Sequence, residues 1–295
     1  MTSQDWLLLL ALSLLWGGSF LFAKIAVAEV PPLTVALLRV TLAAGTLHLL
    51  RLAFRIATPR ELAFWRDVFI MGLLNNAIPF SLIFWGQQAI GAGLASILNA
   101  TTPLFTVLVA HVFTVDERAG SAKILGVIAG MAGVAVMIGH DAMAGFGGHL
   151  WAELAVLAAA LSYGFAGVFG RRFRDRPPLL VASGQLTGSS CLLLLPVLLL
   201  DQPWVLPLPS LRTIGAIVAL ALLSTALAYV IFFRILRRAG STNLSLVTLL
   251  IPVSALLLGV LFLDETVEAH HLVGMALIGS GLAVIDGRVW RLIRV

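Results

Sequence analysis

Apolar residues gather in ten long runs along this chain, and short polar connections separate the runs. A helix needs about 20 apolar residues to cross the hydrocarbon core of a membrane. Each run therefore predicts one membrane-spanning helix, and the pattern predicts an all-α integral membrane protein with antiparallel neighbours. The expected helices cover residues 6–26, 33–51, 67–87, 93–114, 121–139, 150–170, 179–200, 212–233, 242–263 and 270–287.

The second half of the chain repeats the pattern of the first, at an offset of 149 up to a shared proline and 148 after it. The matched positions are Gly91 with Gly240, Ser96 with Ser245, Pro103 with Pro252, Asp116 with Asp264, Glu117 with Glu265, Gly126 with Gly274 and Gly133 with Gly281. Further upstream, Arg39 matches Gln185 and Trp16 matches Tyr163. We expect residues 1–140 and 149–295 to form two five-helix repeats around a central cavity, as in transporters with alternating access.

Basic residues predict the orientation of the helices. With the N-terminus in the cytoplasm, inner connections hold 16 of the 19 Lys and Arg residues, and outer ones hold only Lys24 and Arg212. Basic residues collect on the cytoplasmic side of membrane proteins. We therefore expect a bacterial inner-membrane protein with both termini in the cytoplasm. Because five helices are an odd number, the second repeat must be inverted relative to the first.

Composition excludes several other classes of protein. The chain is 60% hydrophobic and 11% charged, whereas soluble domains are roughly 45–50% apolar and about 25% charged. The net charge of +5 comes from short connections between apolar runs, which argues against a nucleic-acid partner. The single cysteine, Cys191, excludes an internal disulfide. We expect no cofactor and no metal, and we interpret the first run as an uncleaved helix.

Polar residues in the middle of apolar runs predict a substrate site near the membrane midplane, because a polar side chain facing lipid is costly. Cross-helix hydrogen bonding explains single Ser, Thr and Asn residues equally well, and aromatic residues often serve packing alone. Bends at Pro103 and Pro252 would let the helices move between states. The candidate substrate ligands are Trp16, Phe20, Arg39, Asn75, Phe80, Phe84, Asn99, Tyr163, Tyr229 and Asn243.

No acidic residue lies deep within a predicted helix; Glu153, about one turn into its run, comes nearest. Ion-coupled transporters usually keep such a carboxylate as a relay, so the sequence predicts a facilitated uniporter. Arg39 is the one basic residue deep inside a run, about 9 Å from its start. It could bind an anionic group such as a carboxylate, or its long side chain could reach the membrane interface.

Two further interpretations concern assembly and chemistry. Glycines in the fifth and tenth runs allow close helix approach, and we favour packing of these two helices within one chain, as a monomer, over a dimer contact. An integral-membrane enzyme is the alternative of another class. The run from Asp264 to His271 could bind a metal, but it lies in an outer connection, where a solvated turn is the simpler interpretation.

The order and spacing of several motifs resemble the drug/metabolite transporter superfamily, and within it the EamA-type exporters. The motifs are Leu15-Trp16-Gly17-Gly18-Ser19-Phe20, Pro103 and Pro252, and the Asp-Glu pairs at 116–117 and 264–265. The resemblance covers the whole chain and is nearest to bacterial aromatic amino acid exporters. It implies ten helices around a cavity lined by helices 1, 3, 4, 6, 8 and 9, and export of amino acids and related metabolites. A proton-driven drug carrier or a nucleotide-sugar carrier of the same fold is the alternative.

Overall fold

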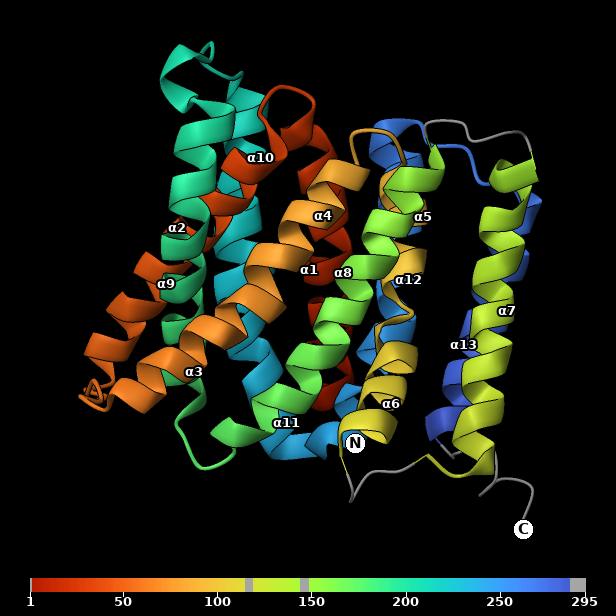
Figure 1. Cartoon of the computed structure of the whole chain (residues 1–295), viewed down its shortest axis with the longest axis horizontal. Helices are drawn as coiled ribbons and strands as arrows, with labels where there is room; N and C mark the ends of the chain where they lie inside the picture. Colours follow the sequence, from red (N-terminus) through yellow and green to blue (C-terminus); the bar gives the residue numbers. More distant parts are fainter. Residues whose placement is uncertain (1, 115–118, 144–148, 287–295) are drawn as a thin grey trace.

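The computed structural model describes residues 2–114, 119–143 and 149–286, and every regular element within these ranges is a helix. The first repeat contains α1 (Ser3–Val27), α2 (Pro32–Ala53), α3 (Leu62–Gly72), α4 (Ile78–Gly86), α5 (Ala92–Asn99), α6 (Thr102–Phe113) and α7 (Ser121–Met143). The second contains α8 (His149–Phe169), α9 (Pro178–Pro196), α10 (Leu211–Ala221), α11 (Ala228–Leu244), α12 (Val247–Leu263) and α13 (Ala269–Asp286). Figure 1 shows that α1 begins and α13 ends at the same face, which agrees with an even number of crossings.

The expected all-helical architecture of about ten apolar helices is confirmed. Among the described residues, eight helical stretches are long and apolar enough to span a membrane, and α12 and α13 are two shorter apolar helices. The predicted end of the eighth crossing at residue 233 is wrong, because helical structure continues to Gly240. Ile235 is fully buried, so this basic end of α11 still packs an apolar face on the bundle. Arg234, Arg237 and Arg238 therefore lie on a helix and not in a connection.

Wide π turns interrupt the third crossing of each repeat near its middle. They are η1 (Leu73–Ala77), between α3 and α4, and η5 (Leu222–Leu227), between α10 and α11. A π turn disturbs the regular pairing of backbone carbonyls, and side-chain hydroxyls can then bond to them. Thr225 Oγ1 donates to Leu220 O at 2.8 Å in this way. The two repeats thus share a local irregularity at the depth of the cavity.

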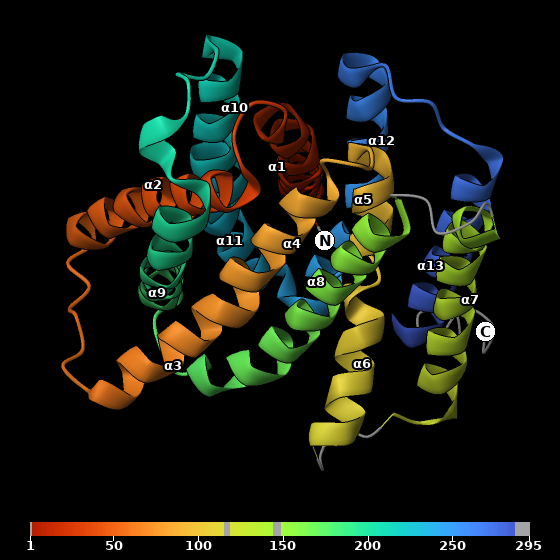
Figure 2. The same ribbon diagram turned by 45° about the horizontal axis from the view of Figure 1, so that its top comes forward.

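The last helix of each repeat, α7 and α13, pack against each other at one side of the bundle (Figures 1 and 2). Glycines bring their backbones together: a Cβ atom added to Gly126 would lie 2.6 Å from Gly281 O, and one on Gly133 would lie 2.7 Å from Gly274 O. The prediction that these glycines serve close packing within one chain is confirmed.

The fourth crossings differ between the repeats. In the first repeat the helix breaks at Ala100 and Thr101, and Pro103 lies in the first turn of α6. In the second repeat Pro252 lies inside the uninterrupted α12. A break therefore accompanies only the first of the two prolines in this structure, and the hinge role of both stays a prediction.

Candidate functional site

A cavity of about 650 Å³ is lined by residues of both repeats. At one end its lining includes two exposed residues, Arg174 of the α8–α9 connection and Pro178 at the start of α9, and at the other the buried residues Phe84 and Gln87. The cavity therefore opens on the face that carries the α8–α9 connection and is closed toward the opposite face. Besides the crossings implied by the family resemblance, the second and seventh contribute, through Arg39 on α2 and Gln185 on α9.

Nine of the ten candidate ligands predicted from the sequence line this cavity, and Pro103 does as well. Their roles in binding stay predictions. The nine are Trp16, Phe20, Arg39, Asn75, Phe80, Phe84, Asn99, Tyr163 and Tyr229.

Aromatic rings form much of the cavity wall. Trp16 on α1 packs against Phe232 on α11 with ring centroids 5.6 Å apart. Phe80 and Phe84, one helical turn apart on α4, stack at 6.0 Å. Such surfaces favour a ligand with an apolar or aromatic body.

Arg39 points inward because it shares a face of α2 with Ala36 and Ala43, both fully buried. Only 6% of Arg39 is exposed. Its Nε atom donates to Thr225 Oγ1 at 3.0 Å, and its guanidinium carbon lies 3.8 Å from the centre of the Phe80 ring. The alternative in which Arg39 reaches the membrane interface is therefore wrong, because Thr225 and the Phe80 ring hold the guanidinium at the cavity.

Gln185, the position in the second repeat that matches Arg39, also faces the cavity and is 4% exposed. Its Nε2 atom donates to the Tyr229 hydroxyl at 3.1 Å, and its Oε1 atom accepts from Asn75 Nδ2 at 3.3 Å. Asn75 also lies 3.4 Å from the Tyr229 hydroxyl. These three side chains join η1, α9 and α11 in one neutral hydrogen-bond network beside the guanidinium.

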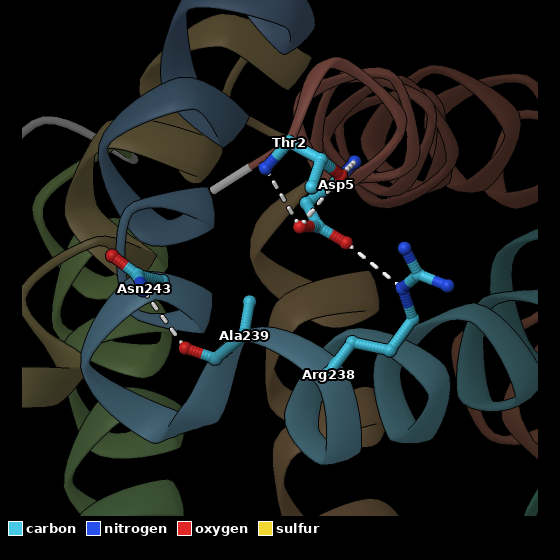
Figure 3. A network of polar contacts seen from close by, with 5 residues as sticks. All are labelled: Thr2, Asp5, Arg238, Ala239 and Asn243. Carbon is cyan, nitrogen blue, oxygen red and sulfur yellow. Dashed lines mark hydrogen bonds and ion pairs between the residues drawn. The ribbon is translucent and has the colours of Figure 1, made fainter.

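Asn243 is the one candidate ligand that does not line the cavity. Its Nδ2 atom donates to Ala239 O, 2.8 Å away across the kink at Gly240, whose backbone is not helical. Figure 3 shows it near the ion pair between Arg238 and Asp5, whose Nε and Oδ1 atoms are 2.9 Å apart. Asn243 lies between the kink at Gly240 and the start of α12, on the face where α1 begins.

The short helix α5 separates the cavity from a second hollow of about 840 Å³ at the opposite face. Ser96 and Asn99 face the cavity, whereas Gly93 and Ile97 face this outer hollow. Glu265 from the α12–α13 connection caps α5, with Oε1 accepting from Ala92 N at 2.6 Å and Oε2 from Gly93 N at 3.0 Å. A carboxylate is favourable at a helix N-terminus, so Glu265 holds this partition against α12.

Two further side chains hold the tip between α4 and α5 at the closed end. Lys24 Nζ donates to the carbonyls of Gln87 at 2.7 Å and Ile90 at 2.9 Å. Gln87 Nε2 donates to Phe20 O at 2.9 Å, and Gln87 is fully buried. Charged and polar contacts, which can break and form again, therefore close this end of the cavity. A continuous layer of apolar side chains does not.

The outer hollow is also shaped by Glu29 in the α1–α2 connection. Its carboxylate accepts hydrogen bonds from the backbone amide and the hydroxyl of Ser210, each at 2.7 Å. These bonds, the backbone amide foremost, lower the pKa of Glu29 below its usual value. Glu29 therefore ties the start of α10 to the end of α1 while it is ionised.

Among the described residues, the charged side chains that line the cavity are all basic. Its charged residues are Arg39, Arg174 and Arg176, and among the described residues no Asp or Glu lines it. Glu153 on α8 is 1% exposed but lies outside the lining. The first Asp-Glu pair, 116–117, falls outside the described residues. The described cavity wall thus offers no carboxylate for a relay of protons or sodium ions.

Three residues at the site are not among the ligands predicted from the sequence. Gln185 and Thr225 contact the network and the guanidinium, and Glu265 is a helix cap and not a solvated turn. The repeat gives a usable signal for two of them, because Gln185 matches Arg39 and Glu265 belongs to a duplicated Asp-Glu pair. Thr225 depends on the π turn, which the hydrophobic pattern does not reveal.

Comparison with known proteins places the chain among transporters. The EamA-like transporter family matches it twice, over residues 5–139 and 150–286. A solved crystal structure that is 25% identical covers 97% of the chain, and the chain covers 98% of it, with a TM-score of 0.67.

The curated relatives include a "Probable amino-acid metabolite efflux pump" of Escherichia coli K12, 26% identical over 99% of this chain and 98% of the relative. The Salmonella typhimurium protein of that name is 28% identical over 96% and 95%. The uncharacterized transporter YoaV of Bacillus subtilis is 26% identical over 93% and 94%. Two family matches that together cover most of the chain show that this multi-pass membrane protein belongs to the EamA-like transporter family.

Proposed function

We propose that this transporter exports neutral, aromatic or otherwise hydrophobic amino acids and related metabolites from the cytoplasm of a bacterium. It works by alternating access as a facilitated uniporter in the inner membrane, with both termini in the cytoplasm. The two relatives named as amino-acid metabolite efflux pumps support this class of substrate.

One observation carries the proposal: among the residues that the structure describes, the aromatic cavity contains a single buried guanidinium, that of Arg39. A guanidinium binds a carboxylate through two parallel hydrogen bonds, which fixes the orientation of the ligand. The rings of Trp16, Phe80 and Phe232 then receive the apolar side chain. Pockets for small ligands commonly measure about 300–1,000 Å³, and the cavity falls in this range.

The closed end suggests how access alternates. The cavity opens on the face of the α8–α9 connection, which basic residues mark as cytoplasmic. In this conformation substrate enters the cavity from the cytoplasm, and α5 closes the cavity toward the opposite face. Release requires α5 to swing away from α12, which breaks the Glu265 contacts. The helix break before Pro103 is a suitable place for such a bend.

The test uses purified protein in liposomes, labelled phenylalanine, and no ion gradient, followed by the same assay with a proton gradient imposed. We expect label to equilibrate, other neutral amino acids to compete, and the rate to ignore the gradient. Uptake that appears only with the gradient would overturn the uniport mechanism. Absence of movement in both assays would shift the substrate to a drug or a nucleotide sugar.

Two asparagines provide a matched pair of variants. Asn99→Ala removes an amide from the cavity wall, and Asn243→Ala removes one that is bonded to its own helix. We expect Asn99→Ala to lower the rate about fivefold to tenfold, the effect of one lost hydrogen bond, and Asn243→Ala to leave it unchanged. Equal effects would show that the cavity is not the path of the substrate.

A further inference from the structure

The proposed function does not account for the net positive charge of the cavity wall. Among the described residues its wall holds three arginines and no acidic residue. Arg176 pairs with Glu61, 2.5 Å away at the cavity mouth, and Arg174 is exposed to solvent. Arg39, in contrast, is buried. A ligand inside the cavity therefore meets an excess of positive charge at Arg39.

Arg39 has no counter-ion within the part of the chain that the structure describes. The titratable groups that act on it are the hydroxyls of Tyr163 and Tyr229, which are neutral at physiological pH. Its one hydrogen bond there goes to Thr225, a neutral acceptor. An arginine keeps its charge even when it is buried, and a buried charge is costly unless an anion pairs with it. The ligand itself is the natural source of that anion.

An α-amino acid satisfies this need only in part. Its carboxylate can pair with Arg39, but its ammonium group then lies a few ångströms from the same guanidinium, with no carboxylate nearby to offset it. Repulsion between like charges is strong where water is excluded. A carboxylate ligand without the ammonium group leaves the site neutral.

Neutral acceptors in the wall indicate what can replace the ammonium group. Asn99 Oδ1 and Gln87 Oε1 are buried carbonyl oxygens without a hydrogen-bond partner among the described residues, and both side chains line the cavity. An unpaired buried acceptor favours a ligand that brings a donor. A hydroxyl group provides such a donor without adding positive charge.

We infer that the preferred substrates are aromatic monocarboxylate anions that carry a 2-hydroxy group in place of the 2-amino group. This inference rests on the proposed function, because it uses the same cavity and the same uniport mechanism. It also gives export a driving force. A membrane potential of about 100 mV, negative inside, supports a roughly fiftyfold outward gradient of a monovalent anion. A zwitterion gains nothing from that potential.

The test compares two ligands of nearly identical shape, 3-phenyllactate and phenylalanine, in liposomes at pH 7.5. A potassium gradient with valinomycin sets the potential, and protein-free vesicles correct for passive leakage. We expect phenyllactate to move at least tenfold faster than phenylalanine. Its efflux should accelerate when the interior is negative, and the phenylalanine rate should not respond.

The outcomes separate this inference from the proposed function. Movement of phenylalanine with little or no movement of phenyllactate overturns the inference and leaves amino acid export standing. Phenyllactate flux that ignores the potential also overturns it. Strong, potential-driven movement of phenyllactate alone supports the inference and removes amino acids from the proposed function. Failure of both ligands to move overturns both.

Variants of Arg39 test whether this residue sets the preference. Arg39→Gln removes the charge, and we expect the tenfold preference for phenyllactate to shrink to about twofold or less. Arg39→Lys keeps the charge and should keep the preference, even where the overall rate falls. A preference that survives in Arg39→Gln would overturn the assignment. Asn243→Ala, outside the cavity, is the control and should retain both rate and preference.

Discussion

Arg39 of the first repeat and Gln185 of the second occupy matching positions, yet they bring different chemistry to the cavity. Arg39 is a buried cation whose hydrogen bond to Thr225 leaves most of the guanidinium fork for a ligand. Gln185 is a neutral amide already bonded to Asn75 and Tyr229. One repeat therefore provides the group that we propose binds the substrate, and the other provides a group that holds the wall in place.

The same two repeats agree at the contact between α7 and α13. Gly126 faces Gly281, and Gly133 faces Gly274, so each repeat contributes one glycine to each close contact. Symmetry is kept where helices must pack and is lost where a ligand must be recognised. A cavity built from two identical halves could not place one charge on one side of a substrate.

The largest expected effect comes from exchanging the two cavity residues. Arg39→Gln gives both repeats the same neutral residue and replaces charged hydrogen bonds with weaker neutral ones, at a net cost of about 1.5–3 kcal/mol. We expect transport of a carboxylate substrate to fall about 10- to 150-fold in the liposome assay. The double variant Arg39→Gln with Gln185→Arg restores the net charge on the opposite repeat.

We expect that double variant to stay as slow as Arg39→Gln alone. Gln185→Arg removes the amide that bonds to Asn75 and Tyr229. It also places the charge away from the Phe80 ring, which lies 3.8 Å from the guanidinium carbon of Arg39. Recovery of the original rate would show that only the net charge of the cavity matters. The position of the arginine in the first repeat and not the second would then be irrelevant to transport.

At the contact between α7 and α13, in contrast, a substitution in either repeat should have the same effect. Gly126→Ala and Gly281→Ala each place a methyl group against the backbone of the facing helix. Overpacking of this kind costs about 1–3 kcal/mol, and we expect both variants to lower the midpoint of thermal unfolding in detergent by similar amounts.

Gly279 on α13 is a matched control, because a Cβ atom there meets nothing within 4 Å. Gly279→Ala should be neutral or slightly stabilising, since alanine favours a helix over glycine by about 1 kcal/mol. Unequal destabilisation by the two contact variants would contradict a symmetric interface.

The partition formed by α5 allows a third, smaller test. Glu265→Gln replaces a charged cap of the Ala92 and Gly93 amides with a neutral one. A charge-assisted hydrogen bond is about twice as strong as a neutral one. We therefore expect the α5 amides to exchange hydrogen about tenfold faster by mass spectrometry.

The neighbouring Asp264 provides the control for charge. Its backbone is left-handed, with φ of 53°, a conformation that asparagine tolerates. Asp264→Asn removes one negative charge from the same connection and should leave exchange in α5 unchanged. If both variants accelerated exchange equally, general electrostatics and not the cap would hold the partition.

The sequence predicts much of this architecture, because lipid imposes strict rules. A run of apolar residues must be a helix, and a polar residue within it must face protein or a cavity. Asn75, Asn99 and Arg39 are found at the cavity for this reason. The duplicated pattern adds the two-repeat arrangement, which the family match supports.

The remaining features depend on packing that no pattern in one sequence reveals. The π turn that brings Thr225 to Arg39 requires contacts from other helices. Asn243 is misplaced because it follows the kink at Gly240 and bonds to Ala239 on the other side of that kink. Glu265 is interpreted as solvated because its partners, Ala92 and Gly93, are distant in sequence. The features at Thr225 and Glu265 depend on tertiary contacts, and the position of Asn243 depends on a local break in the helix.

The smallest expected effect concerns the outer connections, where Glu29 of the first repeat binds Ser210 of the second. These hydrogen bonds lower the pKa of the Glu29 carboxyl in the folded protein. A lowered pKa means that the contribution to stability is complete above the pKa of the unfolded chain and is lost as the pH falls through the folded value. Glu29→Gln lacks this contribution at every pH.

We therefore expect the wild type to unfold at a slightly higher temperature than Glu29→Gln at neutral pH, and the two curves to converge in acid. The measurement is the thermal midpoint in detergent between pH 7 and pH 3. If the thermal midpoints of wild type and Glu29→Gln differed by the same amount at every pH, the hydrogen bonds between the repeats at this face would not depend on the charge of the carboxylate.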